Sequence, residues 1–166
     1  MDYNFKELIT GIRTGKHKLL GTGSSRRVYD LDNGFVIKIA RDIRGIHQNK
    51  NEHKIYSESK SNFFAEVVAV SEEYRCLIMP KAGRIKTVET VCRYYNVKNI
   101  GSLLHGQLAS DIKNGNLSKP DLIRPSSWGL VNDVPLIIDY GLTHEIYRKY
   151  YGLNKLFKKF KPLRYS

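Results

Sequence analysis

Residues 119–143, KPDLIRPSSWGLVNDVPLIIDYGLT, constrain the fold of this chain more than any other stretch. Two short apolar runs are separated by Asn132-Asp133, a pair that tolerates the positive φ angles of a two-residue β-hairpin turn. The runs are residues 128–131 and 134–138. Asp121 precedes this predicted hairpin and Asp139 follows it. The sequence therefore predicts one carboxylate at each flank, with Asp139 at the end of an apolar strand where it could hold a metal ion.

A second β-hairpin is predicted near the N-terminus, where it follows two glycines. Gly21 and Gly23 precede Val28 and a run of alternating residues, then a turn at residues 32–34 and an apolar strand over residues 35–39. Because glycine has no Cβ, the backbone N–H groups of this loop could approach phosphate oxygens closely. A Rossmann fingerprint also begins with glycines, but it must open a helix, whereas the alternation after Val28 indicates strands.

Lys38 lies within the apolar strand of the second hairpin, between residues 35–37 and 39–40. A lysine in a strand is usually solvated, but apolar neighbours on both sides argue against that here. The polar segment that follows predicts a helix over residues 46–57. Glu52 lies in this predicted helix, and Glu58 directly follows it.

The rest of the pattern predicts further helices and strands. Helical spacing of apolar residues predicts a short amphipathic helix over residues 5–12, packed on the sheet, and two helices within residues 87–114. Apolar runs at residues 63–70 and 76–79 are typical of strands, and they bring the first sheet to five strands.

In chain order, these features resemble a protein-kinase-like phosphotransferase of the compact kind found among small microbial, phage and aminoglycoside-type kinases. Asp139-Tyr140-Gly141 is similar to the Asp-Phe-Gly magnesium site, and Val36-Ile37-Lys38 is similar to the lysine-bearing third strand. The resemblance implies an α+β, bilobal fold in a single domain. Its parts would be an N-lobe with a leading helix and a five-stranded antiparallel sheet (1–80), a hinge (81–83), a much reduced helical C-lobe (84–143) and a basic tail (144–166).

The resemblance also implies ATP and Mg²⁺ as cofactors and a role for each matching residue. Lys38 would hold the phosphates, and Asp121 would orient the acceptor hydroxyl. Glu52 would pair with Lys38 and position it, and Glu58 is the second candidate for this partner. Asp139 and Ser126 would bind the metal. The residues expected around the nucleotide are Gly21, Gly23, Val28, Lys38, Glu52, Met79 and Lys81.

Three elements of the kinase pattern are replaced in this sequence. Arg26 replaces the third glycine of the loop, where it could contact phosphate or exclude nucleotide; Lys119-Pro120 replaces His-Arg; and Ser126 replaces the metal-binding asparagine. Two functions are therefore open. The first is transfer of the γ-phosphoryl group to a hydroxyl, on a protein. The alternative is a catalytically weak or inactive pseudokinase that serves as a binding module.

The net charge of +12 is the unusual bulk property of the chain. Residues 140–166 contain seven Lys or Arg and a single acidic residue, Glu145. Such a charge favours a polyanionic partner, such as nucleic acid or an acidic protein surface. The same tail could form a helix with Ile146, Tyr150, Leu153, Phe157 and Phe160 packed on the core. No apolar run is long enough to span a membrane, and the first residues lack the pattern of a signal peptide, so a cytoplasmic location is expected.

Overall fold

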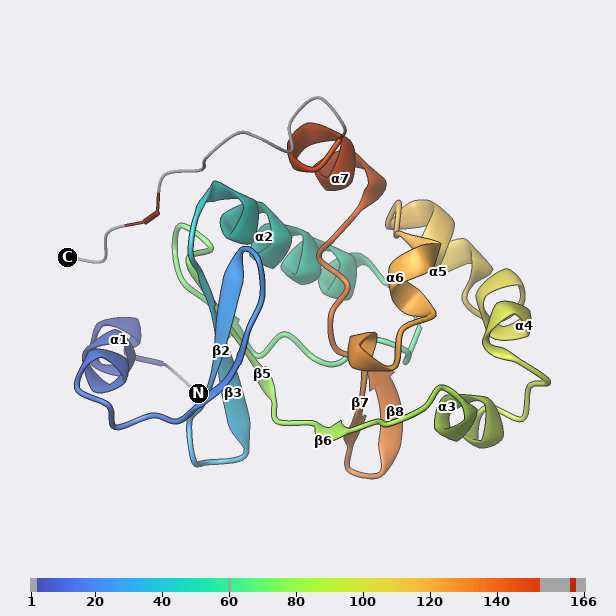
Figure 1. The fold of residues 1–166 in the computed structure, drawn as a ribbon, viewed down its shortest axis with the longest axis horizontal. Coiled ribbons are helices and arrows are strands. Elements are labelled where there is room, and N and C mark those ends of the chain that lie inside the picture. Colours follow the sequence, from blue (N-terminus) through green and yellow to red (C-terminus); the bar gives the residue numbers. More distant parts are fainter. Residues whose placement is uncertain (1–2, 60, 153–161, 164–166) are drawn as a thin grey trace.

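The computed structural model describes residues 3–59, 61–152 and 162–163, which form a mixed α+β structure (Figure 1). A five-stranded antiparallel sheet contains β1 (Leu19–Thr22), β2 (Arg26–Asp30), β3 (Phe35–Ala40), β4 (Ala69–Val70) and β5 (Cys76–Pro80). Its strand order is β1-β2-β3-β5-β4. A three-stranded sheet contains β6 (Gly83–Arg84), β7 (Trp128–Val131) and β8 (Val134–Ile137). The prediction of a five-stranded antiparallel sheet is confirmed.

The helix expected at the N-terminus is α1 (Phe5–Arg13), and it covers one face of the five-stranded sheet. It begins where the side chain of Asn4 accepts a hydrogen bond from the amide of Glu7. Its apolar residues pack against a cluster on the sheet that includes Ile37, Ile39 and Ile78. In Figure 1, α1 lies at one edge of the molecule, and the helices between β6 and β7 lie toward the opposite edge.

The side chains on the opposite face of the sheet follow from the way side chains alternate along β3. Val36 and Lys38 point away from the α1 face, because successive side chains of a strand point to opposite sides. Lys38 pairs across the sheet with Val28 and Leu77, and Val36 pairs with Met79. This face therefore presents one lysine among apolar side chains.

Helix α2 (Ile43–Glu58) follows β3 and is longer than the predicted range of residues 46–57. It begins earlier because the side chain of Asp42 accepts a hydrogen bond from the amide of Arg44 and caps the first turn. The buried side of α2 is mostly polar. Its buried residues are Gly45, Gln48, Asn49, Glu52 and Ile55.

The prediction of a strand over residues 63–70 is wrong for most of that range. Only Ala69–Val70 pairs with β5, as β4. The earlier residues are extended but contact the second sheet instead, where Phe64 forms an isolated bridge with Ile137 and the Ala65 amide donates to the Ile137 carbonyl. The apolar run therefore joins the two sheets rather than completing one of them.

The hairpin predicted from residues 128–131 and 134–138 forms, as β7 and β8, around Asn132 and Asp133. Both residues have positive φ angles, 50° and 64°, as a two-residue hairpin turn requires. Before this hairpin the chain forms α6 (Lys119–Leu122) and a 3₁₀ turn (Pro125–Ser127). Trp128 is buried at the start of β7, and its indole N–H donates to the carbonyl of Leu122, which fixes the turn against the hairpin.

Three helices, not the two predicted, occupy residues 87–114. They are α3 (Glu89–Tyr94), α4 (Ile100–His105) and α5 (Ala109–Asn114). The second predicted helix is divided because α4 ends at Gly106, and Gly115 ends α5 as expected.

The last described helix is α7 (His144–Tyr150), in which Ile146 and Tyr150 are buried, as the packed-tail alternative predicts. The other tail residues named for that packing, Leu153, Phe157 and Phe160, lie outside the described residues. None of the helices in the described ranges combines the length and the apolar composition needed to span a membrane.

Candidate functional site

A cavity of about 570 Å³ lies between the Lys38-bearing face of the five-stranded sheet and the segments that flank the β7–β8 hairpin. Eight of the ten residues that the sequence singled out line it. They are Gly23, Val28, Lys38, Met79, Lys81, Asp121, Ser126 and Asp139. Glu52 lies behind the cavity, next to Lys38, and Gly21 does not line it.

Lys38 and Glu52 form a buried ion pair, as predicted. The ammonium nitrogen of Lys38 is 3.0 and 2.9 Å from the two carboxylate oxygens of Glu52, and it also donates to the carbonyl of Ile138. A lysine ammonium has three N–H groups. All three donors of Lys38 are therefore engaged within the protein, in contacts that join β3, α2 and the end of β8.

Glu52 is fully buried and collects hydrogen bonds from three parts of the chain. Its Oε1 accepts from the amides of Tyr140 and Gly141, each at 3.2 Å, and its Oε2 is 3.0 Å from Nη1 of Arg26. These contacts offset the large cost of burying a carboxylate. Glu52 therefore holds the Tyr140-Gly141 backbone, Lys38 and Arg26 in fixed relative positions.

The Arg26 side chain points inward from the start of β2, toward α2 and the Asp139 carboxylate. Its Nη1 contacts Glu52 and also donates to Oδ1 of Asn49 at 3.3 Å. Its Nη2 is 2.5 Å from Oδ1 of Asp139. The Arg26 side chain is only 8% exposed, whereas that of Asp139 is 55% exposed. Arg26 therefore links the buried Glu52 to the carboxylate that lines the cavity.

The charges of this cluster shift the pKa values of its members. Partial desolvation raises the pKa of Asp139, but Arg26 and Lys38 together outweigh that effect and hold the pKa below its ordinary value. Desolvation lowers the pKa of Lys38, with Glu52 opposing and Arg26 reinforcing the shift. Two cations and two carboxylates thus form one compact, closely balanced network at the end of β8.

Asp121 lies across the cavity from the sheet, in α6 rather than directly at the start of the hairpin. The Ser127 side chain donates to the Asp121 carbonyl at 2.7 Å, and the Ser127 carbonyl accepts from the amide of Ile138 at 2.8 Å. Ser127 therefore ties the two carboxylate-bearing flanks together. The Asp121 carboxylate itself pairs with Arg124, with 3.4 Å between Oδ1 and Nη1.

The sheet contributes three apolar side chains to the cavity, Val28, Val36 and Met79 from β2, β3 and β5. Lys81 at the next turn forms an ion pair with Asp30, at 2.6 Å. The amide of Lys81 donates to the carbonyl of Gly34, so this N–H is not available to a ligand. A planar apolar group could lie against these three side chains. A backbone hydrogen bond to that group would have to come from an atom of this segment other than the Lys81 N–H.

The two glycines of the expected phosphate loop differ in position. Gly21 belongs to β1 and pairs with Val28, so the structure places it in a strand, outside the cavity. Gly23 begins the turn between β1 and β2, where its amide donates to the carbonyl of Arg26 at 2.8 Å. The loop that reaches the cavity is therefore Gly23-Ser24-Ser25.

The sequence reasoning missed a polar row on α2 that supports the site. Gln48 accepts from the side chain of Ser25, and Asn49 accepts from Arg26 while donating to the Tyr74 carbonyl. One turn earlier, a Cβ at Gly45 would lie 2.3 Å from the Ser25 carbonyl, so a glycine is required there. These residues and Glu52 recur at spacings of three or four, the helical signal that could have identified them.

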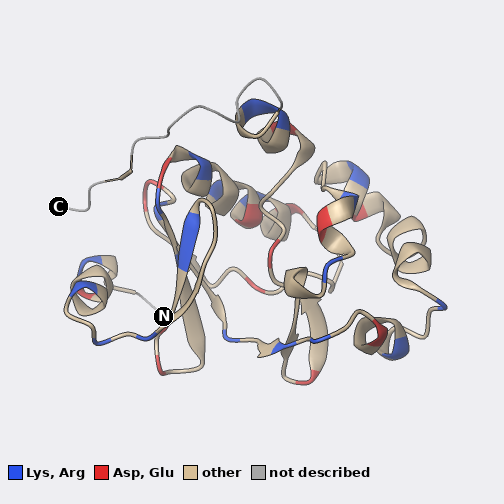
Figure 2. Cartoon of the chain, in the orientation of Figure 1, with Lys and Arg blue, Asp and Glu red and all other residues tan. Residues whose placement is uncertain are grey.

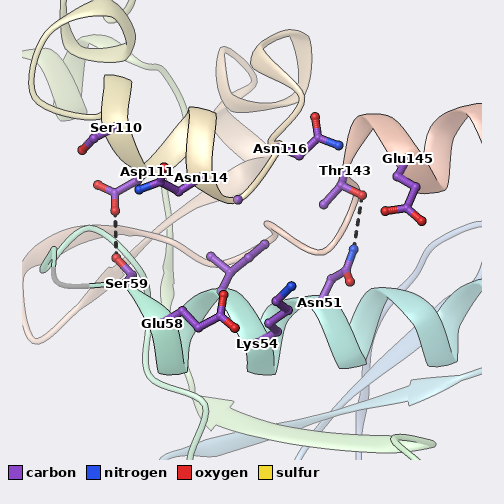
Figure 3. Close-up of a pocket in the computed structure, with 12 residues that line it drawn as sticks. Asn51, Lys54, Glu58, Ser59, Ser110, Asp111, Asn114, Asn116, Thr143 and Glu145 are labelled. Carbon is purple, nitrogen blue, oxygen red and sulfur yellow. Dashed lines mark hydrogen bonds between the residues drawn. The ribbon is translucent and has the colours of Figure 1, made fainter.

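A second pocket, of about 400 Å³, lies between α2, α5 and α7 (Figure 3). Its side chains include Lys54, Glu58 and Glu145, and it is bridged by the Asn51–Thr143 and Ser59–Asp111 hydrogen bonds. Glu58, the second candidate for the partner of Lys38, is exposed in this pocket. Glu52, not Glu58, is therefore the carboxylate that pairs with Lys38.

Magnesium in proteins is usually held by one or two carboxylates together with phosphate oxygens and waters. Both carboxylates that line the cavity already have an arginine partner, Arg26 for Asp139 and Arg124 for Asp121. Ser126 adds only a neutral hydroxyl. Throughout residues 3–59, 61–152 and 162–163, no group of three or more His, Cys, Asp or Glu could hold a metal ion. The donor set as arranged does not fit a magnesium ion.

Lysine and arginine are spread over the described elements and are not confined to the tail; Figure 2 shows them on β2, α2 and α7, among others. Arg148 and Lys149 lie in the last turn of α7.

No protein-family model matches this sequence, and no curated protein matches it.

Proposed function

We propose that this chain is a protein-kinase-like protein that binds a nucleoside triphosphate in the cavity between the five-stranded sheet and the β7–β8 hairpin. One observation carries the proposal. The Lys38–Glu52 ion pair, buried and 14 residues apart, lies directly behind a cavity that Asp121 and Asp139 also line. A lysine fixed by a helix glutamate beside a strand-end aspartate is the arrangement that kinase-like sites use for phosphates.

The residues around the cavity suit different parts of a nucleotide. Val28, Val36 and Met79 offer an apolar surface of the kind that binds a flat base. Arg26 contacts Asp139, and Lys38 contacts the carbonyl of the preceding residue, Ile138. Both cations suit the phosphates, with Lys38 exchanging its contact to the Ile138 carbonyl for a phosphate oxygen. The bilobal arrangement of a kinase, with the sheet on one side of the nucleotide and the helical part on the other, belongs to the same proposal.

Phosphoryl transfer to a hydroxyl is the second candidate, and Asp121 favours it. A carboxylate on the far side of the cavity from Lys38 is placed to orient an acceptor hydroxyl, such as that of a protein. The pairing of Asp139 with Arg26 and the serine at position 126 favour a pseudokinase that binds nucleotide and acts as a binding module. The cavity therefore supports nucleotide binding better than it supports turnover.

A thermal-unfolding titration with ATP tests the binding. At about 100 times Kd, a ligand raises the free energy of unfolding by about 2.7 kcal/mol, so the melting temperature should rise with ATP. Lys38→Met should abolish the rise. Lys54→Met is the matched control, because Lys54 is exposed on α2 in the other pocket. An equal rise in wild type and Lys38→Met would contradict the proposal.

An assay with radiolabelled ATP separates the two candidates. Incorporation of label into a protein acceptor by wild type, and its loss in Asp121→Ala and Asp139→Ala, would support transfer. ATP binding with no incorporation would support the binding module. The polyanion partner expected for the basic tail is tested separately, as binding to DNA, RNA or an acidic protein that weakens steeply as salt rises.

A further inference from the structure

Each of the two carboxylates that line the proposed nucleotide cavity forms an ion pair with an arginine. Nη2 of Arg26 is 2.5 Å from Oδ1 of Asp139, and Nη1 of Arg124 is 3.4 Å from Oδ1 of Asp121. The positions at which a kinase-like site would use negative charge to attract a divalent cation are thus already neutralised by side chains of the same chain.

Arg26 is a fixed part of the fold rather than a surface side chain that happens to reach Asp139. Behind the cavity its guanidinium contacts Glu52 at 3.0 Å and Asn49 at 3.3 Å. Asn49 is itself fully buried and donates to the Tyr74 carbonyl at 2.9 Å. A guanidinium bound on one side by these groups can present its positive charge toward the cavity in one orientation only.

This arrangement disfavours a divalent cation at Asp139. Magnesium demands a nearly octahedral shell of oxygens, and an ion on Asp139 would lie beside the guanidinium of Arg26, where like charges repel. An arginine can instead supply directed N–H donors to phosphate as well as to carboxylate. Arg26 therefore cancels the charge of the Asp139 carboxylate, as a bound metal ion would otherwise do. A phosphate can then lie beside Asp139.

We infer that the cavity binds its nucleotide without a divalent cation, with Arg26 as the cation that neutralises Asp139 and faces the phosphates. Arg124 plays the corresponding part at Asp121. This inference rests on the proposed nucleotide binding, and it names the form in which the nucleotide is bound: the metal-free phosphate ester. Its chemical signature is an affinity for ATP that does not depend on Mg²⁺.

The test is a calorimetric titration of ATP into the full chain, once in EDTA and once in Mg²⁺. The dissociation constants of the wild type are expected to agree within about threefold. Arg26→Gln should weaken binding in EDTA by about tenfold or more, because Asp139 then repels the phosphates, and Mg²⁺ should restore part of the affinity. Arg27→Gln, on the neighbouring exposed residue of β2, is the matched control and should leave both constants unchanged.

The outcomes separate this inference from the proposed function. Wild-type binding that disappears in EDTA and returns with Mg²⁺ would overturn the inference while leaving nucleotide binding intact. Absence of ATP binding in both conditions would overturn the proposed function, and the inference with it. Should Arg26→Gln fail to fold, the comparison of wild type in EDTA and Mg²⁺ still decides, and Arg26→Lys, which keeps the charge, should retain metal-free binding.

Discussion

Arg26 and Asp139 are 113 residues apart in the sequence and form an ion pair at 2.5 Å. The pair joins the start of β2 in the five-stranded sheet to the segment that follows β8 in the three-stranded sheet. Because Arg26 also contacts the buried Glu52, the position of the Asp139 carboxylate depends on α2 as well as on its own strand. Stability and ligand binding should therefore respond together to changes in this cluster.

The ionisation of Asp139 should contribute to stability in a pH-dependent way. Its pKa in the folded protein is below the ordinary value, so the folded state binds this proton less readily than the unfolded state does. The contribution is present above about pH 4, the unfolded value, and is lost as the pH falls through the folded pKa.

The measurement is urea unfolding of wild type and Asp139→Asn at a series of pH values. The difference in the free energy of unfolding should be largest near neutral pH and should shrink as the pH falls below about 4. Asp133→Asn, in the exposed turn of the hairpin, is run over the same range as a control. A difference between wild type and Asp139→Asn that stays constant across the series would contradict the role given to Asp139.

Glu52→Gln should destabilise the fold strongly. It leaves the buried guanidinium of Arg26 and the buried ammonium of Lys38 without their shared carboxylate. Breaking such a buried pair costs about 3 to 5 kcal/mol in the free energy of unfolding. Glu58→Gln, six residues later on the exposed side of α2, should change it by less than about 0.5 kcal/mol. Similar losses in the two variants, measured by urea unfolding, would show that the cluster does not stabilise the fold.

The local parts of this structure could be predicted because they depend on neighbouring residues. Asn132-Asp133 specified the hairpin turn, and the apolar spacing near the N-terminus specified α1. The ion pair between Lys38 and Glu52 was also expected, because the motifs resemble the kinase pattern, in which a strand lysine pairs with a helix glutamate.

The parts that could not be predicted depend on distant pairing. A run such as residues 63–70 has strand character, but its sequence does not say that most of it bridges the two sheets. The direction of the Arg26 side chain depends on Asn49 and Asp139, neither of which is its neighbour in sequence. The buried side of α2 was not recognised because most of its residues are polar. A regular spacing of apolar residues does not reveal a polar buried face.

Gly141 should be required for the position of Asp139. A Cβ at this residue would lie 2.4 Å from the Gln48 carbonyl oxygen of α2, far closer than side chains tolerate. Gly141→Ala should therefore push the segment after β8 away from α2, weaken the Gly141 contact to Glu52, and cost about 1 to 3 kcal/mol in the free energy of unfolding. ATP affinity should fall with it.

Gly21→Ala is the matched comparison, because a Cβ at Gly21 meets nothing within 4 Å and its φ angle is ordinary. The free energy of unfolding should change by less than about 1 kcal/mol. ATP affinity should not change, because Gly21 does not line the cavity. A loss of affinity in Gly21→Ala, with affinity retained in Gly141→Ala, would reverse the assignment of which glycine shapes the site.

Ser24 and Tyr151 should act as one contact across the mouth of the cavity. Both residues line it, and their hydroxyl oxygens are 3.2 Å apart, although Ser24 follows β1 and Tyr151 follows α7. Ser24→Ala and Tyr151→Phe remove the same hydrogen bond, so each should lower the free energy of unfolding by about 0.5 to 1.5 kcal/mol. The double variant should lose little more than either single variant, which a double-mutant cycle measured by urea unfolding will detect. Because the bond holds the turn between β1 and β2 against the end of α7, its loss should also speed the dissociation of ATP in stopped-flow experiments. Fully additive losses of stability would mean that the two hydroxyls do not interact in solution.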